Sequence, residues 1–205
     1  MTRRRGRGPF TRLVETVVVT SRLYGRSAAD ARPPQVADPY TVGPASAADL
    51  ARFESDLGPE LRPGKAGMVV RRASRPDIGL FVAVGPDGVV CGFGNTEYGR
   101  IRDEHLRLDA GSWPGNAHLF DDYVAMPHRG HRLQAALLQA RIWAAAERGD
   151  STVTILVEDS NHASRASVQR AGFTPWARVL TLKRPGWRRC WVWARSPGGL
   201  LAQTG

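Results

Sequence analysis

The 205-residue sequence contains only two cysteines, Cys91 and Cys190, which excludes a disulfide scaffold or a multi-cysteine zinc module but leaves one bridge open. No run of about 20 apolar residues occurs, so a membrane-spanning helix is excluded as well. The apolar run Leu13–Val19 is short and contains Glu15, and no clear small-residue cleavage site follows it. We therefore expect a cytoplasmic protein without a membrane span.

Lysine is also scarce, because 27 of the 29 basic residues are arginine, which we attribute to genomic composition. The net charge of +10 is unevenly distributed. Residues 1–32 contain eight arginines against two carboxylates, a charge of +6, which leaves +4 for residues 33–205. A cationic arm attracts polyanions without sequence specificity. We expect residues 1–37 to be a partly disordered basic extension with weak polyanion contacts, and residues 38–205 to form the domain.

Strand and helix signals alternate along the expected domain. Ser46 begins a capping-box pattern before an apolar stripe at helical spacing, and a turn at residues 85–88 joins two strand-like runs. The polar stretch 99–115 predicts a loop, and Met68–Arg72 predicts a strand or part of a connection. Expected helices cover 46–57, 130–148 and 161–172. Expected strands cover 40–42, 80–84, 89–96, 118–124, 152–157, 179–182 and 187–193. This order predicts a mixed α/β fold with a central sheet.

The stretch from Asp122 to Leu138 predicts a strand, a short basic loop and a helix in direct succession. A helix N-terminus presents about four unpaired N–H groups and a partial positive charge, which suits a phosphate. Gly130 allows the backbone to approach a ligand, and Arg129 and Arg132 add cationic donors. The pattern predicts a pyrophosphate site, although an ordinary corner with solvated arginines would have the same sequence.

A second segment, Asp159–Phe173, contains an N-x-x-S pattern leading to Gly-Phe. With the V-x-x-x-x-R-G-x-x-L pattern that precedes it, it resembles the acetyl-CoA-binding core of the GCN5-related N-acetyltransferase (GNAT) superfamily. The resemblance is specific over 117–173 and broader over 38–195. It implies the acyl-CoA N-acyltransferase fold, a mostly antiparallel central sheet flanked by helices. It also implies acetyl-CoA as cosubstrate and direct transfer of an acetyl group to an amine.

The resemblance implies which residues bind acetyl-CoA. The strand end would hold the pantetheine arm, and the basic loop would hold the pyrophosphate. The start of the later helix would contact the cofactor and line the same channel. The residues so implied are Val124, Ala125, Met126, Arg129, Gly130, His131, Arg132, Leu133, Gln134, Asn161 and Ser164. Arg132 and Gln134 stand where the family has loop glycines. Val168 stands where the family often has a tyrosine that acts as general acid. Either water, Ser164 or Ser167 would therefore protonate the leaving thiolate, or no acid is needed.

Acetyl transfer needs a base, because an alkylamine must lose a proton before it attacks the thioester. His118 falls where histone-type family members have their catalytic glutamate, and strand alternation predicts Asp122 on the same face. His118 is a candidate base, and Asp122 is a candidate base or amine anchor. The alternatives are a histidine hydrogen-bonded to the backbone and a carboxylate that caps the nearby loop. Glu97 and Tyr98 are expected either to line the acceptor pocket or to lie in a solvated loop.

His128 and His131 have a spacing that a metal site could use, but no convincing third ligand accompanies them, so we expect no metal. Trp187, Trp191 and Trp193 share one strand face, which predicts sheet packing, an acceptor wall or a homodimer interface.

The sequence thus predicts an acetyl-CoA-dependent N-acetyltransferase that acts on a primary amine. A small molecule is the first candidate acceptor, and a protein N-terminus or lysine the second. The alternative is a non-catalytic acyl-CoA-binding or polyanion-binding protein on the same scaffold, with the arginine arm as its working part.

Overall fold

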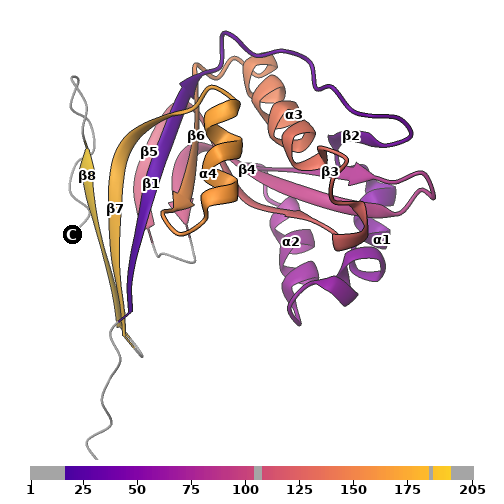
Figure 1. Ribbon diagram of the computed structural model, residues 1–205, viewed down its shortest axis with the longest axis horizontal. Coiled ribbons are helices and arrows are strands. Elements are labelled where there is room, and N and C mark those ends of the chain that lie inside the picture. Colours follow the sequence, from indigo (N-terminus) through magenta and orange to yellow (C-terminus); the bar gives the residue numbers. More distant parts are fainter. Residues whose placement is uncertain (1–16, 104–107, 185–186, 195–205) are drawn as a thin grey trace, which may run out of the picture.

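The chain folds around one eight-stranded sheet (Figure 1). The structure is a computed structural model and describes residues 17–103, 108–184 and 187–194. The strand order is β2-β3-β4-β5-β6-β1-β7-β8, and only β5 and β6 are parallel neighbours. The strands are β1 (Val17–Ser27), β2 (Thr41–Pro44), β3 (Ile78–Val84), β4 (Val90–Asp103), β5 (Leu108–Val124), β6 (Thr152–Glu158), β7 (Thr174–Arg184) and β8 (Trp187–Ala194). The α-helices are α1 (Ala47–Leu57), α2 (Lys65–Ala73), α3 (Leu133–Glu147) and α4 (His162–Arg170). The expected mixed, mostly antiparallel sheet flanked by helices is confirmed.

Strand β1 lies inside this sheet, although its sequence was expected in the basic extension. It pairs antiparallel with β6 on one side and β7 on the other. Leu23 and Tyr24 are buried in the core. Because a strand with two hydrogen-bonded neighbours is integral to its sheet, the domain boundary expected after residue 37 does not hold for Val17–Ser27. The part of the extension expected to be disordered, residues 1–12, lies outside the described residues.

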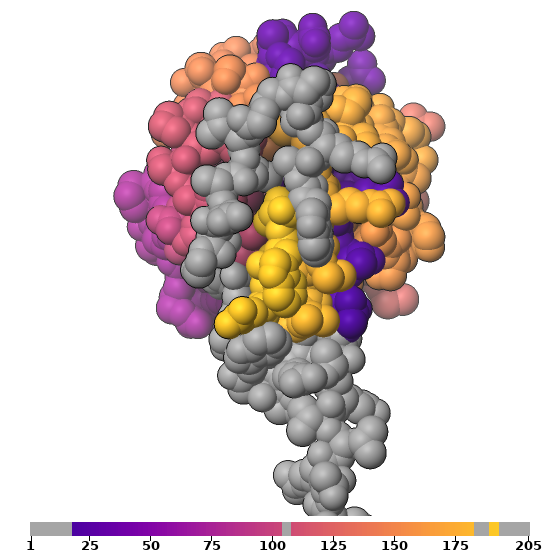
Figure 2. Space-filling view, turned by 90° about the vertical axis from the view of Figure 1, so that its left-hand side faces the viewer, coloured from indigo at the N-terminus to yellow at the C-terminus, as the bar shows by residue number. Residues whose placement is uncertain are grey.

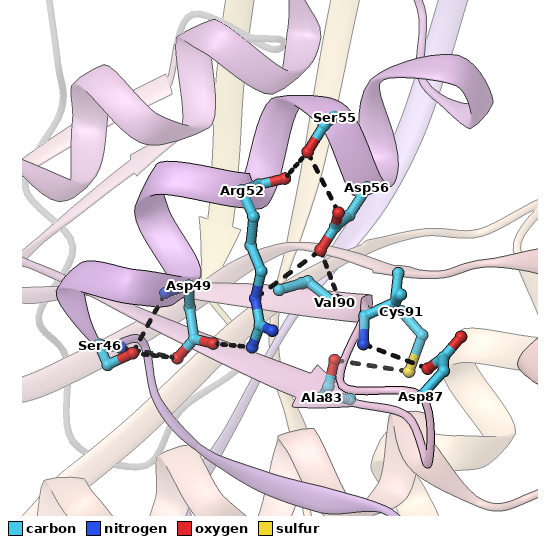
Figure 3. Close-up of polar contacts among 10 residues, drawn as sticks. Ser46, Asp49, Arg52, Ser55, Asp56, Ala83, Asp87, Val90 and Cys91 are labelled. Atoms are coloured by element: carbon cyan, nitrogen blue, oxygen red, sulfur yellow. Dashed lines mark hydrogen bonds and ion pairs between the residues drawn. The ribbon is translucent and has the colours of Figure 1, made fainter.

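Helix α1 begins at the expected capping box (Figure 3). Ser46 Oγ accepts the Asp49 N–H at 3.1 Å, and Asp49 Oδ2 accepts the Ser46 N–H at 2.9 Å. Near the other end of the helix, Asp56 accepts the N–H of Val90 at 2.9 Å, which ties α1 to the start of β4. Phe53 is buried against β4 residues. The cap and the apolar stripe therefore both act as the sequence predicts.

The expected strand over Met68–Arg72 is wrong, because this segment lies in helix α2. The β-branched pair Val69 and Val70 suggests a strand. The helix nevertheless buries Ala66 and Val69, which are three residues apart and so lie on one face. Helices α1 and α2 pack together and cover one face of the sheet near β3 and β4 (Figure 1).

The expected loop over 99–115 is also wrong. Strand β4 continues to Asp103, β5 begins at Leu108, and the two pair across this stretch, with Arg100 opposite Ser112. Glycines at positive φ and shifts in register let the hairpin bend. Ile101 then packs on Leu23 of β1 and Ala177 of β7. The long hairpin therefore covers part of the sheet that α1 and α2 leave open.

The opposite face carries α3 and α4, whose apolar residues pack on β5 and β6 in one core cluster. At the far edge of the sheet, β8 pairs only with β7 among the described strands and lies at the surface (Figure 2). Trp191 of β8 is partly exposed, whereas the side chains of Trp187 and Trp193 lie outside the described residues. None of the helices in the described part of the chain is long and apolar enough to span a membrane.

Candidate active site

Strands β5 and β6 separate in the middle of the sheet. Their pairing ends at Leu119 and Ile155, although β5 continues to Val124 and β6 to Glu158. A β-bulge causes the separation. Across from Phe93 and Asn95, which are two residues apart on β4, β5 uses Tyr123 and Phe120, which are three apart. A bulge bends its strand and raises its twist. The β6-facing edge of β5 beyond Leu119 is thereby left without a strand partner among the described residues.

The extra residue in β5 is marked by Asp121, whose φ of 59° is left-handed and unusual for a non-glycine residue. The bulge also changes which side chains share a face. The ring of Phe120 stacks beside His118, whereas Asp122 points to the other face and pairs with Arg141 of α3. The strict alternation expected for His118 and Asp122 is therefore wrong.

The separated strands form the floor of a cleft of about 210 Å³ on the α3 and α4 side. Asn161 caps α4 by accepting the Ser164 N–H at 3.1 Å, and both residues line the cleft. Val168, which is buried, and Ser167 also line the cleft. The lining of this cleft consists of Phe120, Asp121, Asp122, Gln134, Leu138, Ile155, Leu156, Val157, Glu158, Asn161, Ser164, Ser167 and Val168.

The cleft is followed by a second hollow of about 490 Å³ at the N-terminus of α3. Gln134 lines both, and Arg129, Gly130, Arg132 and Leu133 line the second. The backbone N–H groups of residues 130–135 donate no hydrogen bond to any described residue, since the first such bond of the helix runs from Ala136 to Arg132. Six unpaired donors beside two arginines make a site suited to a phosphate.

Arg132 occupies the N-cap of α3 in a left-handed conformation, with φ 59° and ψ 18°. A glycine adopts this conformation without steric cost, whereas an arginine pays on the order of 1 kcal/mol. The loop therefore keeps the backbone turn that a glycine would favour while adding an exposed guanidinium. His131 and His128 both pack against Tyr40, whose hydroxyl lies 3.2 Å from His128 Nδ1.

The end of β5 uses some of its own backbone donors. The Ala125 N–H donates to Cys91 at 2.8 Å, and the Met126 N–H donates to Glu60 Oε2 at 3.0 Å. The Met126 N–H and the Tyr123 hydroxyl hold the pKa of Glu60 below its ordinary value. Val124 lines the hollow and its carbonyl accepts from Arg129 at 3.1 Å. Of the three residues predicted at the strand end, only Val124 is therefore among those that line the hollow.

A separate hollow of about 340 Å³ opens on the α2 side of the sheet. Phe120 and Asp121 line both this hollow and the cleft, so the two meet at the break between β5 and β6. Two apolar residues, Ile78 and Phe120, contribute to an otherwise charged lining. The charged residues are Arg62, Lys65, Arg72, Arg75, Glu97, Arg102, Asp103 and Asp121.

Glu97 is the most deeply buried carboxylate of this hollow, with 1% of its side chain exposed. Its Oε1 accepts from Arg102 at 2.7 Å and from Arg75 at 3.2 Å. Within the described residues, no hydrogen bond falls on its Oε2. Burial raises the pKa of Glu97 above its ordinary value, and the two arginines oppose that rise. Glu97 and Tyr98 are the two residues that the sequence predicts in an acceptor pocket or a solvated loop. Both lie in β4, which continues past the expected end at Thr96, and only Glu97 is among the described residues that line this hollow.

His118 lies next to Glu97 across β4 and β5 but lines none of the hollows described above. Its side chain is fully buried, and Nδ1 lies 3.0 Å from Thr154 Oγ1. Its Nε2 has no partner within the described residues. Burial lowers the pKa of His118 to about 4, so the imidazole is neutral near pH 7.

Asp122 lines the cleft, but its carboxylate is engaged by Arg141. Its two oxygens accept from the guanidinium at 2.6 and 2.7 Å, and the arginine is fully buried. Among the described residues, no group of three or more His, Cys, Asp or Glu residues could hold a metal ion.

The matches to known proteins agree with this geometry. The profile of the acetyltransferase (GNAT) family matches residues 48–173. Among solved structures, a GCN5-related N-acetyltransferase from Sphaerobacter thermophilus is 20% identical with a TM-score of 0.58, over 82% of this chain and 52% of that one. One from Kribbella flavida is 18% identical with a TM-score of 0.55, over 84% and 61%.

The ribosomal-protein-S18-alanine N-acetyltransferase from Escherichia coli is 20% identical with a TM-score of 0.52, over 68% of this chain and 80% of that one. No curated protein sequence matches significantly. At these identities the structural likeness establishes the fold, and the chain spans less than two thirds of the first two structures. The family profile covers more than half of the sequence, and the chain belongs to the acetyltransferase (GNAT) family.

Proposed function

We propose that the protein is an acetyl-CoA-dependent N-acetyltransferase that moves an acetyl group to a primary amine by direct transfer. The observation that carries this proposal is that the cleft and the hollow on the α2 side meet at the break between β5 and β6. The cleft continues to the unpaired amides at the start of α3, and the other hollow opens on the opposite side of the sheet. A thioester and an amine that enter from the two sides would meet beside Phe120 and Asp121.

The residues of the cleft fit coenzyme A. The amides of residues 130–135, with Arg129 and Arg132, would bind the pyrophosphate. The unpaired edge of β5 would bind the pantetheine arm and donate to the carbonyl oxygen as it gains negative charge. When bound, acetyl-CoA supplies an activated acetyl group. Ser164 and Ser167 line the cleft, and their hydroxyls are the candidate proton donors to the leaving thiolate.

Glu97 is the candidate base for the amine. It faces the hollow on the α2 side, and one of its oxygens accepts no hydrogen bond from the described residues. Burial raises the pKa of Glu97 above its ordinary value, so the carboxylate binds a proton more readily, as a base must. Since Asp122 neutralises a buried arginine and His118 lies below the surface of the hollows, we assign structural roles to both.

The test measures CoA binding by titration calorimetry and thiol release from acetyl-CoA with a panel of primary amines. We expect Arg132→Gln to weaken CoA binding by about tenfold, because one charge-assisted contact to a phosphate is lost. Arg148→Gln, at the other end of α3, is the matched control and leaves the CoA affinity unchanged.

Absence of CoA binding by the wild-type protein would overturn the proposal. CoA binding without thiol release for any amine would favour the non-catalytic acyl-CoA-binding protein instead. Equal losses of affinity in Arg132→Gln and Arg148→Gln would show that the phosphates do not bind at the start of α3.

A further inference from the structure

The described residues that line the hollow on the α2 side carry an excess of positive charge. Five of them are cationic, and three are carboxylates. When Asp77 is added, which lies outside the lining and pairs with Arg75, five cations still face four carboxylates within the described part of the chain. A cavity of this size and polarity suits a small ligand with a few fixed polar groups.

Two of the three carboxylates found among the described lining residues are each shared between two cations. Asp121 accepts from Lys65 at 2.6 Å and from Arg72 at 3.0 Å. Glu97 bridges two further arginines through one oxygen. Neither carboxylate is therefore free to balance an additional cation such as a second ammonium group on a ligand.

Arg62 has no such partner. It is exposed in the connection before α2, lines the hollow, and makes no ion pair with any described residue. Guanidinium groups bind carboxylate and phosphate oxygens through two parallel hydrogen bonds. Arg62 lies on the α2 side of the hollow, and Phe120 lies at the break in the sheet. A ligand in the hollow would therefore contact both the Arg62 guanidinium and the end of β5.

We infer that this hollow is the acceptor site and that the acceptor is a small amine with an anionic group, a carboxylate or a phosphate. This inference rests on the proposed function. The anionic group binds Arg62. The amine lies at the break between β5 and β6, near Glu97. The excess positive charge disfavours acceptors with a second ammonium group and favours those with a compensating negative charge.

The test compares amines that differ only in the anionic group. The two pairs are O-phosphoethanolamine against ethanolamine, and β-alanine against β-alaninamide. We expect kcat/KM to be about tenfold higher for the anionic member of at least one pair, and the pair that responds distinguishes phosphate from carboxylate. Arg62→Gln should raise KM for that acceptor about tenfold with little change in kcat. Arg71→Gln, an exposed arginine of α2 outside the lining, is the matched control.

Preference for the neutral amines, or the same preference in wild-type protein and Arg62→Gln, would overturn the inference while leaving the acetyltransferase proposal intact. If no amine is acetylated, the proposed function fails, and calorimetry with CoA-loaded protein decides the anion site separately. Binding of O-phosphoethanolamine or β-alanine that Arg62→Gln weakens would support the site. Equal binding of charged and neutral amines, or none, would overturn it.

Discussion

Asp122 and Arg141 form a two-pronged ion pair between β5 and α3, with N–O distances of 2.6 and 2.7 Å. The guanidinium is fully buried and also donates to the carbonyls of Asn95 and Leu137. The pair therefore fixes the bulged end of β5 against the helix whose N-terminus forms the candidate phosphate site.

Removing the carboxylate leaves a buried cation without its counter-charge, which costs about 3 kcal/mol or more. We expect Asp122→Ala to lower the free energy of unfolding by about that amount in urea denaturation. The double variant Asp122→Ala/Arg141→Met should recover part of the loss, because no charge remains buried. Asp109→Ala breaks an exposed pair with Arg100 and is the control, with little change in the denaturation midpoint. An Asp122→Ala protein of wild-type stability would contradict a structural role.

Glu97 provides the test of the proposed base. We expect Glu97→Gln to lower kcat by about 100-fold or more while CoA affinity stays unchanged, because the amide cannot accept the ammonium proton. In the wild-type protein, kcat/KM should rise as pH increases through the pKa of Glu97, which burial raises. That limb of the profile should disappear in Glu97→Gln and persist in the control Asp109→Asn. Normal turnover by Glu97→Gln would exclude Glu97 as the base.

His118 predicts a dependence of stability on pH. Its pKa is about 4 in the folded protein because of burial, against an ordinary value of 6.5. Between these two pH values the unfolded chain binds a proton that the folded protein does not. The stabilisation is therefore complete above pH 6.5 and is lost as pH falls toward 4, by about 3 kcal/mol in total.

We expect His118→Gln to remove this part of the pH dependence. The measurement compares the free energy of unfolding of the wild-type protein and the variant at pH 7 and at pH 4. The carboxyl groups contribute equally to both proteins and cancel in the difference. The same variant decides the catalytic hypothesis for this residue. A loss of turnover at pH 7 with an unchanged pH dependence of stability would show that His118 acts in the reaction.

Local signals in the sequence predict the elements that local chemistry determines. The capping box at Ser46, the turn at residues 85–88 and the Asn161 cap all lie where the patterns indicate. The candidate anion site before α3 is predicted for the same reason, since its backbone donors belong to one short segment.

Features that depend on distant partners are not predictable in this way. The left-handed Asp121 of β5 has no local signature, because its carboxylate is held by Lys65 and Arg72 of helix α2. Glu97 follows a strand pattern into a stretch rich in glycine and charge, which indicates a loop until the pairing with β5 is known. The opposite faces of His118 and Asp122 follow from the bulge and not from the sequence period.

Strand β1 was missed for a related reason, since its sequence contains arginines and adjoins a basic segment. Its place in the sheet can be tested at Gly25, where an added Cβ would lie 2.3 Å from the ring of Trp176 on β7. The backbone of Gly25 pairs with both β6 and β7, so neither strand can move away freely. We expect Gly25→Ala to lower the free energy of unfolding by about 1 to 3 kcal/mol, the usual cost of overpacking.

Gly43→Ala in β2 is the matched control, because no atom lies within 4 Å of its added Cβ. That variant should keep wild-type stability or gain slightly, since alanine has less backbone freedom to lose on folding than glycine. Thermal and urea unfolding of both variants measure the difference. If Gly25→Ala were as stable as Gly43→Ala, residues 17–27 would not pack between β6 and β7, and the core at Leu23 and Tyr24 would have to be formed by another segment.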